Sequence, residues 1–233
     1  YYTSANYQCP TGVTWSLEKR LEVLALANKY GFTIIEDDCV GELYFTANRC
    51  LPMKAYDKHG CVIYLNSFSK TLMAGFRLGY IVLPNRFNQR FISAKFIADI
   101  ASPTIVQYAM AEFIRTGLYA ENLNKLRQEY CSKCHYMMKR IKDSQCLQVA
   151  VPVTGGAFLW VRLPEGISSH AFYQQMQKQG MSILPSAVFC QPGTFENYIR
   201  LSFASCSKSD ISRGIALLDE VAAVWLSGSQ KCF

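Results

Sequence analysis

The stretch LNSFSKTLMAGFRLGY, residues 65–80, decides how the rest of the sequence is interpreted. It carries one lysine, Lys70, between two apolar segments, 61–65 and 78–83, which we expect to be buried strands. Lysine is rarely buried unless it is paired. An ion pair, a lowered pKa or a covalent bond to a carbonyl compound would hold a lysine in such a place. We favour the covalent bond, because the residues described below supply what a carbonyl cofactor needs.

Upstream of this stretch, the sequence predicts a strand at the N-terminus, a helix and a second strand. Apolar residues recur at helical spacing from Leu17 to Ala27, and Thr14 or Ser16 supplies an N-cap. Residues 32–35 form a short apolar run of the kind that is buried on both faces of a parallel sheet. The resulting βαβ order predicts an α/β domain with a mostly parallel sheet, the large domain.

The pattern changes after a long helix that we predict from Tyr119 to about Lys142. Two apolar runs, 148–151 and 157–161, flank a pair of glycines and predict a hairpin. Two helices and two short strands, 181–184 and 198–203, follow this hairpin. The sequence therefore predicts a smaller α+β C-terminal domain. We place the two domains at residues 1–120 and 121–233.

Composition limits the class of protein. The chain has 233 residues, of which 50% are hydrophobic and 18% charged, as in globular domains. It has no apolar run long enough to cross a membrane and no signal peptide, so we expect a cytoplasmic protein without membrane contact. The net charge of +7 suits an anionic ligand. No block of lysine and arginine is long enough to predict DNA binding by this chain itself.

The ten cysteines do not form a disulfide framework, and we expect most of them to be reduced, buried apolar residues. The run Cys131-Ser132-Lys133-Cys134-His135 matches the pattern of haem attachment. It lies inside the predicted long helix, so we interpret it as a helix face. We predict no metal site.

Three consecutive carboxylates, Glu36-Asp37-Asp38, follow the predicted strand at its C-terminal end. Ligands bind at this edge in open α/β sheets. A solvated loop with a helix cap is the alternative interpretation of these acids. Asp37 becomes more specific when it is considered together with Lys70.

These residues match the needs of pyridoxal 5'-phosphate (PLP), which a lysine holds as a Schiff base. A carboxylate keeps the pyridine nitrogen protonated, and Asp37 suits that role. Hydroxyls and a cation hold the phosphate, and Ser67, Ser69 and Arg77 flank Lys70.

A guanidinium binds the α-carboxylate of an amino-acid substrate, and Arg200 lies in an apolar strand where it needs an anion. Each residue also has a structural alternative. Arg77 and Arg200 could each form an ordinary ion pair, and the two serines could be turn residues. The set of residues is more specific than any member alone.

The chain resembles the fold-type-I, class I/II PLP-dependent aminotransferases, and most closely the aminotransferase-like domain of MocR-type regulators of the GntR family. The motifs that carry this resemblance span the chain: Pro10-Thr11-Gly12, Glu36-Asp37-Asp38, Ser67-Phe68-Ser69-Lys70 with Arg77-Leu78-Gly79-Tyr80, and Tyr198-Ile199-Arg200-Leu201-Ser202-Phe203. The resemblance implies that Lys70 forms the Schiff base and Asp37 binds the pyridine nitrogen. It also implies that Ser67, Arg77 and, less surely, Ser69 bind the phosphate, that Arg200 binds a carboxylate, and that the protein is a homodimer.

Two departures from the family concern one oxygen of the cofactor. The family usually has an asparagine before Pro-Thr-Gly and a tyrosine shortly after the aspartate, both bonded to the phenolic oxygen of PLP. Cys9 holds the first position here, and Cys39 and Val40 the second. A thiol is a weak donor, so we expect an electronically altered Schiff base. The chain also begins just before Pro-Thr-Gly, so we expect it to be the C-terminal portion of a longer protein.

Three functions follow as hypotheses. The first is an aminotransferase that transfers an amino group between an amino acid and a 2-oxo acid. The second is a PLP- or effector-sensing domain of a GntR/MocR-type regulator, whose DNA-binding domain is not in this chain. The third is a degenerate or truncated fragment with a structural role, in which PLP is absent.

Overall fold

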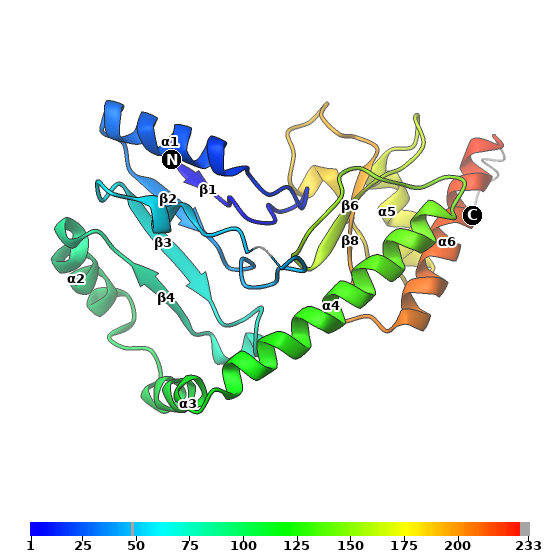
Figure 1. Ribbon diagram of the computed structural model, residues 1–233. Helices are drawn as coiled ribbons and strands as arrows, with labels where there is room; N and C mark the ends of the chain where they lie inside the picture. The colour runs from blue at the N-terminus through cyan, green and yellow to red at the C-terminus, as the bar shows by residue number, and fades with distance from the viewer. Residues whose placement is uncertain (48, 229–233) are drawn as a thin grey trace. The chain divides into compact units, whose positions relative to one another are not determined.

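A computed structural model describes residues 1–47 and 49–228 of the chain (Figure 1). These residues form two compact units, each described separately below. The helix α4 (Leu118–Lys142) contributes residues to both units, which divide within it between Gln128 and Glu129. The domain division near residue 120 stays a prediction. The first unit comprises Tyr1–Gln8, Val13–Gln128 and Thr154–Gly156; the second comprises Cys9–Gly12, Glu129–Val153 and the chain from Ala157 onward.

The first unit is built on a sheet with the strand order β1-β2-β3-β4. The strands β1 (Tyr2–Thr3), β2 (Ile34–Asp37) and β3 (Val62–Ser67) are parallel, and β4 (Gly79–Val82) pairs antiparallel with β3. The helix α1 (Leu17–Tyr30) connects β1 to β2. The mostly parallel α/β sheet expected from the sequence is therefore confirmed.

The helix α1 has the ends that the sequence predicts. The side chain of Ser16 accepts a hydrogen bond from the backbone N–H of Lys19 at 3.2 Å, which caps the N-terminus. Gly31 ends the helix in the left-handed region, at φ 71°. Leu24 and Ala27 of α1 are buried in the hydrophobic core that includes Ile34 of β2 and Val62 of β3.

The strand β2 lies two residues further along the chain than predicted. Its first ladder pair is Ile34 with Val62, and its last is Asp37 with Leu65. Glu36 and Asp37 therefore belong to the strand itself, whereas we expected them to follow it. The prediction relied on apolar character, but pairing with β3 sets the bounds of β2.

A strand forms within the apolar segment 78–83 as predicted, but the prediction that it is buried is wrong. All four residues of β4 are exposed, with Tyr80, Ile81 and Val82 each more than 40% accessible. The strand β4 is the last in the sheet order and pairs only with β3 among the described strands. Three short 3₁₀ turns and two helices complete this unit: η1 (Met53–Tyr56), η2 (Ala74–Phe76), η3 (Asn85–Phe87), α2 (Asn88–Asp99) and α3 (Thr104–Arg115).

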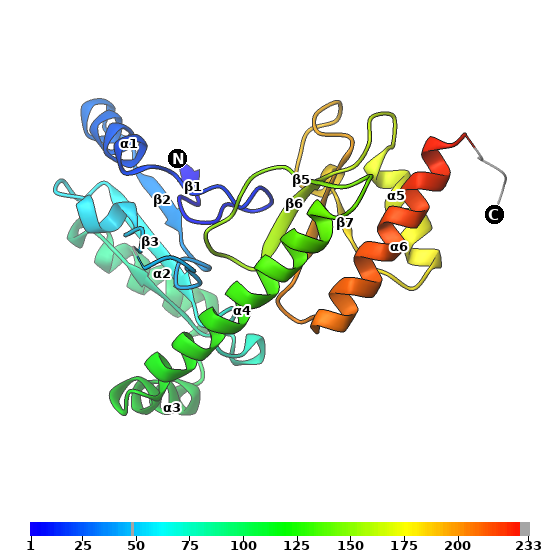
Figure 2. The same ribbon diagram turned by 45° about the vertical axis from the view of Figure 1, so that its right-hand side comes forward.

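The second unit is an antiparallel sheet with helices, as the predicted α+β domain requires. Its strand order is β5-β6-β8-β7, and β5 with β6 forms the predicted hairpin pair. Figure 2 shows α5 and α6 side by side, and the rings of Phe172 and Trp225 meet between them with centroids 5.7 Å apart. The elements are β5 (Gln148–Val149), β6 (Phe158–Arg162), α5 (Ser169–Lys178), β7 (Leu184–Pro185), η4 (Ser186–Val188), β8 (Tyr198–Ser202) and α6 (Lys208–Leu226).

The strand that we predicted at 181–184 is shorter and begins later. It pairs only at Leu184 with Arg200 and at Pro185 with Ile199. Proline has no backbone N–H to extend the ladder, and the chain enters the turn η4 immediately afterwards.

The expectation that most cysteines are buried is wrong among the described residues. Nine of them are free cysteines, and only Cys61 and Cys134 are buried. Cys9 and Cys50 are exposed. The expectation from apolar character failed because many of these cysteines lie in loops, where hydropathy does not predict burial.

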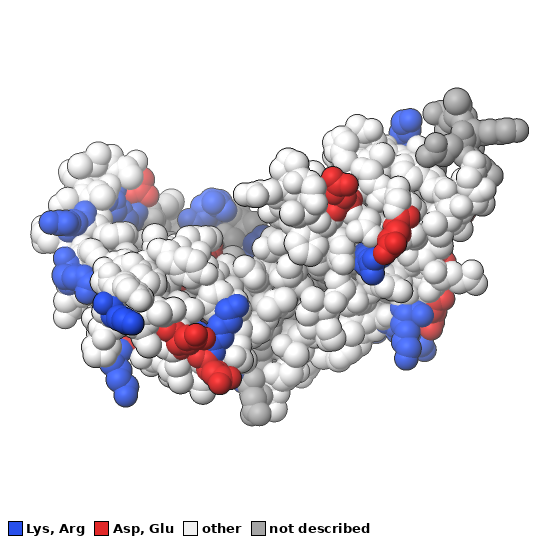
Figure 3. All heavy atoms as spheres, turned by 90° about the horizontal axis from the view of Figure 1, so that it is seen from above, with Lys and Arg blue, Asp and Glu red and all other residues white. Residues whose placement is uncertain are grey.

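None of the helices in the described ranges combines the length and the apolar composition that a membrane crossing requires. On the face drawn in Figure 3, lysine and arginine are interspersed with aspartate and glutamate. This face therefore carries no continuous basic patch.

Candidate functional site

The C-terminal ends of β2 and β3 bring the main predicted residues to one edge of the sheet. Asp37 is the last residue of β2, and Ser67 is the last of β3. The strands are parallel, and Asp37 pairs with Leu65, so β3 extends two residues beyond the end of β2. The loop that carries Lys70 therefore leaves the sheet at the edge where ligands bind in open α/β sheets.

Backbone hydrogen bonds shape the Lys70 loop. The N–H of Phe68 donates to the carbonyl of Leu78 at 3.0 Å, and the N–H of Leu72 donates to the carbonyl of Phe68 at 2.9 Å. The hydroxyl of Ser67 accepts from the N–H of Ser69 at 3.1 Å, as the turn interpretation of the serines requires. This bond uses an acceptor lone pair of Ser67 and leaves its O–H proton free for another acceptor.

Lys70 itself is exposed in this chain, so the expectation of a buried lysine is wrong here. Among the described residues, no carboxylate forms an ion pair with Lys70. The ion-pair explanation of this lysine therefore has no support in the described part of the chain.

The first turn of α4 anchors the same loop. The side-chain amide of Asn122 donates to the carbonyl of Thr71 at 2.9 Å. The hydroxyls of Thr71 and Tyr119 are 3.0 Å apart, and Thr71 is buried. The ring of Tyr119 packs edge-on against Phe68, with centroids 5.7 Å apart. The residue next to Lys70 is thus fixed by the side chains of a separate helix.

Arg77 occupies the left-handed region, with φ 49° and ψ 37°. A residue with a Cβ pays a steric penalty there, and such positions are frequent at functional sites. Gly79 follows, and a Cβ at this residue would lie 2.6 Å from the backbone oxygen of Asn66. Only glycine allows β4 to pair this closely with β3, which sets the path from Lys70 to Arg77.

Asp37 has two donors on its carboxylate. The hydroxyl of Tyr2 donates to Oδ2 at 2.5 Å, and the backbone N–H of Cys39 donates to Oδ1 at 3.2 Å. Burial, together with the charge of Asp37 and a hydrogen bond to it, raises the pKa of the Cys39 thiol to about 12, while the charge of Lys70 opposes this rise. Cys39 is therefore a protonated thiol at neutral pH, close to both Asp37 and Lys70.

The neighbouring acids are buried, so the solvated-loop interpretation of the acidic run is wrong. Glu36 accepts from the backbone N–H groups of Met53 and Lys54, at 2.7 and 2.9 Å. Asp38 accepts from Asn6 at 2.8 Å and from the Tyr64 hydroxyl at 2.9 Å. Burial raises the pKa of both carboxyls, against the effect of these hydrogen bonds.

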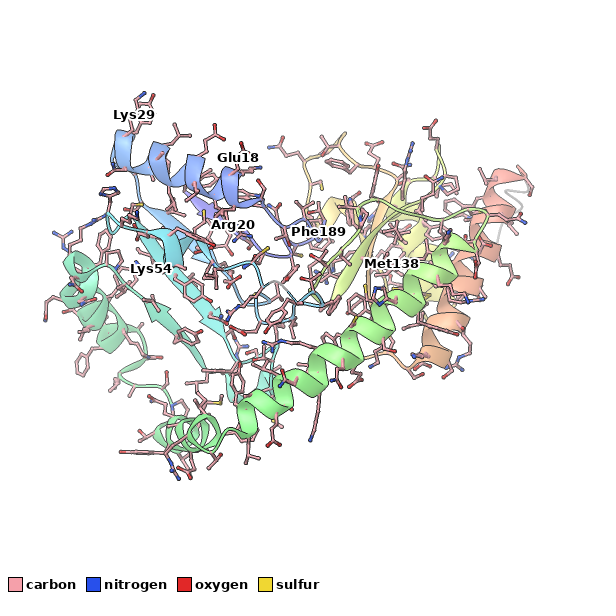
Figure 4. All side chains as sticks on the ribbon, viewed as in Figure 1. Glu18, Arg20, Lys29, Lys54, Met138 and Phe189 are labelled. Carbon is pink, nitrogen blue, oxygen red and sulfur yellow. The ribbon has the colours of Figure 1, made fainter. Side chains whose placement is uncertain are left out.

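A buried arginine supports this acidic segment from α1. Arg20, a residue of α1, is 1% exposed, and its side chain points below the helix in the view of Figure 4. It donates to the carbonyls of Trp15, Leu51 and Ala5, each at 3.0 Å, and to the side-chain oxygen of Asn6 at 2.7 Å. Since Asn6 in turn donates to Asp38, one network connects α1 to the end of β2.

Cys9 and Arg200 both belong to the second unit, where they contact each other. Nη1 of Arg200 donates to the sulfur of Cys9 at 3.1 Å. The guanidinium lies 5.1 Å from the ring centroid of Phe158 and 5.0 Å from that of Phe189. Its buried Nε has no hydrogen-bond partner among the described residues, and none of their carboxylates pairs with it. The guanidinium therefore has donors available for an anion.

The haem-like run is part of a helix, as expected. Cys131 and His135 lie on α4, with Sγ and Nδ1 3.5 Å apart, and Cys134 is buried. No cluster of potential metal ligands occurs in the described ranges. Residues 131–135 are accounted for by helix packing.

Sequence reasoning missed several residues that hold the site, namely Tyr2, Asn6, Tyr64, Thr71, Tyr119 and Asn122. Most of them act through contacts between elements that are far apart in the chain, so local motifs do not report them. Tyr2 could have been found from the sequence. Once β1 is paired with β2, strand alternation places Tyr2 on the same face as Asp37.

Comparison with known proteins adds a family and several relatives. The model of the family "Aminotransferase class I and II" matches residues 4–218. The chain is 32% identical over 220 residues to an aromatic-amino-acid aminotransferase of Thermococcus litoralis, covering 94% of this chain and 53% of that protein. It is 30% identical over 225 residues to YisV, an uncharacterised HTH-type transcriptional regulator of Bacillus subtilis, covering 95% of this chain and 46% of that protein.

A solved structure has a similar fold. The α-aminoadipate aminotransferase LysN of Thermus thermophilus, complexed with N-(5'-phosphopyridoxyl)-L-leucine, superposes with a TM-score of 0.89 at 28% identity, covering 97% of this chain and 59% of that one. The chain spans about half the length of the curated relatives that it matches.

Proposed function

Because the chain belongs to the family of class I and II aminotransferases, we propose that it forms part of a PLP-dependent enzyme that transfers amino groups between amino acids and 2-oxo acids. The observation that carries this proposal is the meeting of Asp37 with the Lys70 loop at the C-terminal ends of β2 and β3. Bound PLP would supply an electron-withdrawing ring that stabilises negative charge at the substrate α-carbon.

The residues of the first unit fit this cofactor. Lys70 offers an exposed amine without a carboxylate partner among the described residues, which suits a covalent bond to an aldehyde. The same amine would afterwards move protons at the substrate. Asp37 would accept a hydrogen bond from the N–H of the pyridine ring and so keep the ring nitrogen protonated. Ser67, Ser69 and Arg77 would hold the phosphate, with the hydroxyls donating and the guanidinium neutralising charge.

Arg200 of the second unit would bind the α-carboxylate of the substrate. Its planar fork of donors matches a carboxylate, and the rings of Phe158 and Phe189 lie within 5.1 Å of the guanidinium. The sulfur of Cys9 is a weak acceptor, so a carboxylate would displace it readily. We further propose that the protein is a homodimer, as the resemblance implies, and that it is cytoplasmic.

The replacement of Lys70 tests this proposal. In the full-length protein, Lys70→Ala should abolish the visible absorbance that PLP gains when it is bound to a lysine. Lys58→Ala, which changes an exposed lysine of the loop before β3, is the matched control and should retain this absorbance. If the absorbance persists in Lys70→Ala, the assignment of the lysine is wrong.

A second function is favoured by Cys9 and Cys39, which stand where the family has two donors to the cofactor's phenolic oxygen, and by the similarity to an HTH-type regulator. Here the same site would sense PLP or an amino acid, and nucleic acid would be bound by a separate domain. The PLP-loaded protein, mixed with amino acids and no 2-oxo acid, separates the two functions. Conversion of the cofactor to its amine form supports the enzyme, whereas binding without conversion supports the sensor.

The third possibility is a fragment with a structural role only. It predicts that the full-length wild type and its Lys70→Ala variant do not differ in their binding of PLP. Equilibrium titration of PLP into the full-length wild type and into Lys70→Ala tests this. Equal, weak binding by both would favour the structural role.

A further inference from the structure

The hydroxyl of Tyr2 forms a contact with Asp37 that the roles above leave unused. The two residues lie on neighbouring parallel strands, with Tyr2 paired to Ile35 and Thr3 to Glu36. Side chains alternate along a strand, so Tyr2, Ile35 and Asp37 share one face. The burial pattern agrees: Thr3, Ile34 and Glu36 are buried, while Tyr2, Ile35 and Asp37 are more accessible.

The reach of a tyrosine side chain bridges the diagonal between these positions. From its place opposite Ile35, the ring extends along the strand direction to Asp37, and its Oη lies 2.5 Å from Oδ2. Bonds of this length are typical of a hydroxyl donating to a carboxylate. The hydrogen bond to Asp37, followed by burial, raises the pKa of Tyr2 to about 12, so the hydroxyl keeps its proton at neutral pH.

The two oxygens of Asp37 therefore have different environments. Oδ1 accepts from the backbone N–H of Cys39 at 3.2 Å, and the Cys39 thiol also bonds to this carboxylate. Oδ2 accepts from Tyr2. A donor at each oxygen fixes the rotation of the carboxylate about its terminal bond.

We infer that Tyr2 is a positioning residue, which orients the Asp37 carboxylate toward the ring nitrogen of the cofactor. This inference rests on the proposed function, because it gives Asp37 the role stated above. Tyr2 does not touch the cofactor in this account; it acts through Asp37 alone. Replacing the hydroxyl should therefore change the electronic state of the bound cofactor while leaving the fold intact.

Tyr2→Phe removes only the hydroxyl, and Tyr1→Phe is the matched control on the preceding residue. The ring of Tyr1 packs against Phe32, with centroids 6.4 Å apart, and alternation places it on the other face of the strand. In full-length cofactor-free protein labelled with ¹³C, the carboxyl carbon of Asp37 should shift in Tyr2→Phe and stay unchanged in Tyr1→Phe. If the signal of the Asp37 carboxyl carbon is unchanged in both variants, Tyr2 does not contact Asp37 and the inference is wrong.

The second measurement uses the PLP-loaded full-length protein and the pH midpoint of its lysine-dependent absorbance. Without the hydroxyl of Tyr2, the Asp37 carboxylate is free to rotate away from the ring nitrogen. The ring is then less protonated, which makes the lysine-linked nitrogen more basic. The midpoint should rise by about half a pH unit in Tyr2→Phe. A rise of a full pH unit would require a larger free-energy change than a hydrogen bond as exposed as this one contributes. Tyr1→Phe should match the wild type.

The two failures are distinguishable. A midpoint that stays at the wild-type value, or falls, in Tyr2→Phe overturns the role of Tyr2 and leaves the proposed function standing. Absence of any lysine-dependent absorbance in the wild type overturns the proposed function, and the inference with it.

Discussion

Asp57 shows how strongly one buried residue is tied to its surroundings. Its side chain is fully buried just before β3, where it accepts from the backbone N–H groups of Val62 at 2.9 Å and Cys61 at 3.0 Å, and from Nζ of Lys54 at 3.1 Å. Burial alone would raise the pKa of this carboxyl, but these bonds outweigh it and hold the pKa at about 2. The carboxylate thus fixes the start of a strand that leads to Lys70.

Asp57→Asn should lower the free energy of unfolding at pH 7 by about 2 kcal/mol, because the shift is close to two pKa units and the new amide would face N–H donors. A lowered pKa contributes stability that is present above the ordinary Asp value and is lost as pH falls toward 2. The difference between wild type and variant should therefore shrink between pH 4 and pH 2. Urea denaturation at several pH values measures it.

The control for this measurement is Asp99→Asn. Asp99 ends α2, where it pairs with Lys95 on the surface, and both side chains are 53% exposed. This change should move stability by no more than about 0.5 kcal/mol. A difference between Asp57→Asn and wild type that does not depend on pH would contradict the role given to the Asp57 charge.

At the same scale, the sequence predicted some site residues better than others. One short segment carries four of the predicted site residues, and its spacing alone places them near each other: Ser67, Ser69, Lys70 and Arg77. Tyr2 was missed because its contact with Asp37 depends on the register of two strands, which no local pattern contains. The exposure of Lys70 was predicted wrongly, because apolar residues were assumed to be covered.

At the scale of elements, α4 controls the loop that carries Lys70. Its first turn supplies Tyr119 and Asn122, which bond to the hydroxyl and to the carbonyl of Thr71. The sequence predicted this helix almost to its ends, because its apolar periodicity is long. It did not predict that the helix would hold a loop, since the partner residues lie about 50 positions apart in the chain.

Asn122→Ala should loosen this loop without unfolding the unit. The carbonyl of Thr71 would lose its donor, which costs about 1 kcal/mol for a partly buried bond. Hydrogen exchange at the backbone amides of Thr71 and Leu72 should become several-fold faster, and PLP should dissociate faster from the full-length protein.

The matched control is Asn124→Ala, two positions along α4. The side chain of Asn124 accepts from Arg127 at 3.2 Å and forms no hydrogen bond to the loop among the described residues. Exchange at Thr71 and Leu72 should stay at the wild-type rate in this variant. Equal acceleration in both variants would show a general effect on α4 and would refute the anchor.

At the scale of the whole molecule, the first unit carries more exposed apolar surface than a self-contained domain. No residue of α2 is buried, and Ile97 and Ile105 are 84% and 80% exposed. Short helices draw most of their stability from packing of an apolar face, and monomeric proteins rarely leave such faces open. The sequence suggested helices here correctly, but it could not show whether anything in the chain covers them.

The 233-residue chain should therefore bind the dye ANS and associate with itself at micromolar concentration. The double variant Ile97→Glu/Ile105→Glu should reduce both the fluorescence gain and the association, as measured by sedimentation. Val188→Glu is the control, since Val188 is 61% exposed on η4 of the second unit. If the double variant associates as strongly as the wild type, this surface is not responsible.

At Arg77, the residue that is best for stability differs from the residue that is best for cofactor binding. A glycine at φ 49° would relieve a strain of about 1 kcal/mol, so Arg77→Gly should raise the thermal midpoint of the chain by a few degrees. The same change removes the guanidinium proposed to hold a phosphate, so affinity for PLP should fall at least tenfold. Random mutagenesis screened for heat resistance alone should accumulate glycine at this position, and a screen that also requires cofactor should retain arginine. The residue recovered at position 77 would then record whether cofactor binding was under selection.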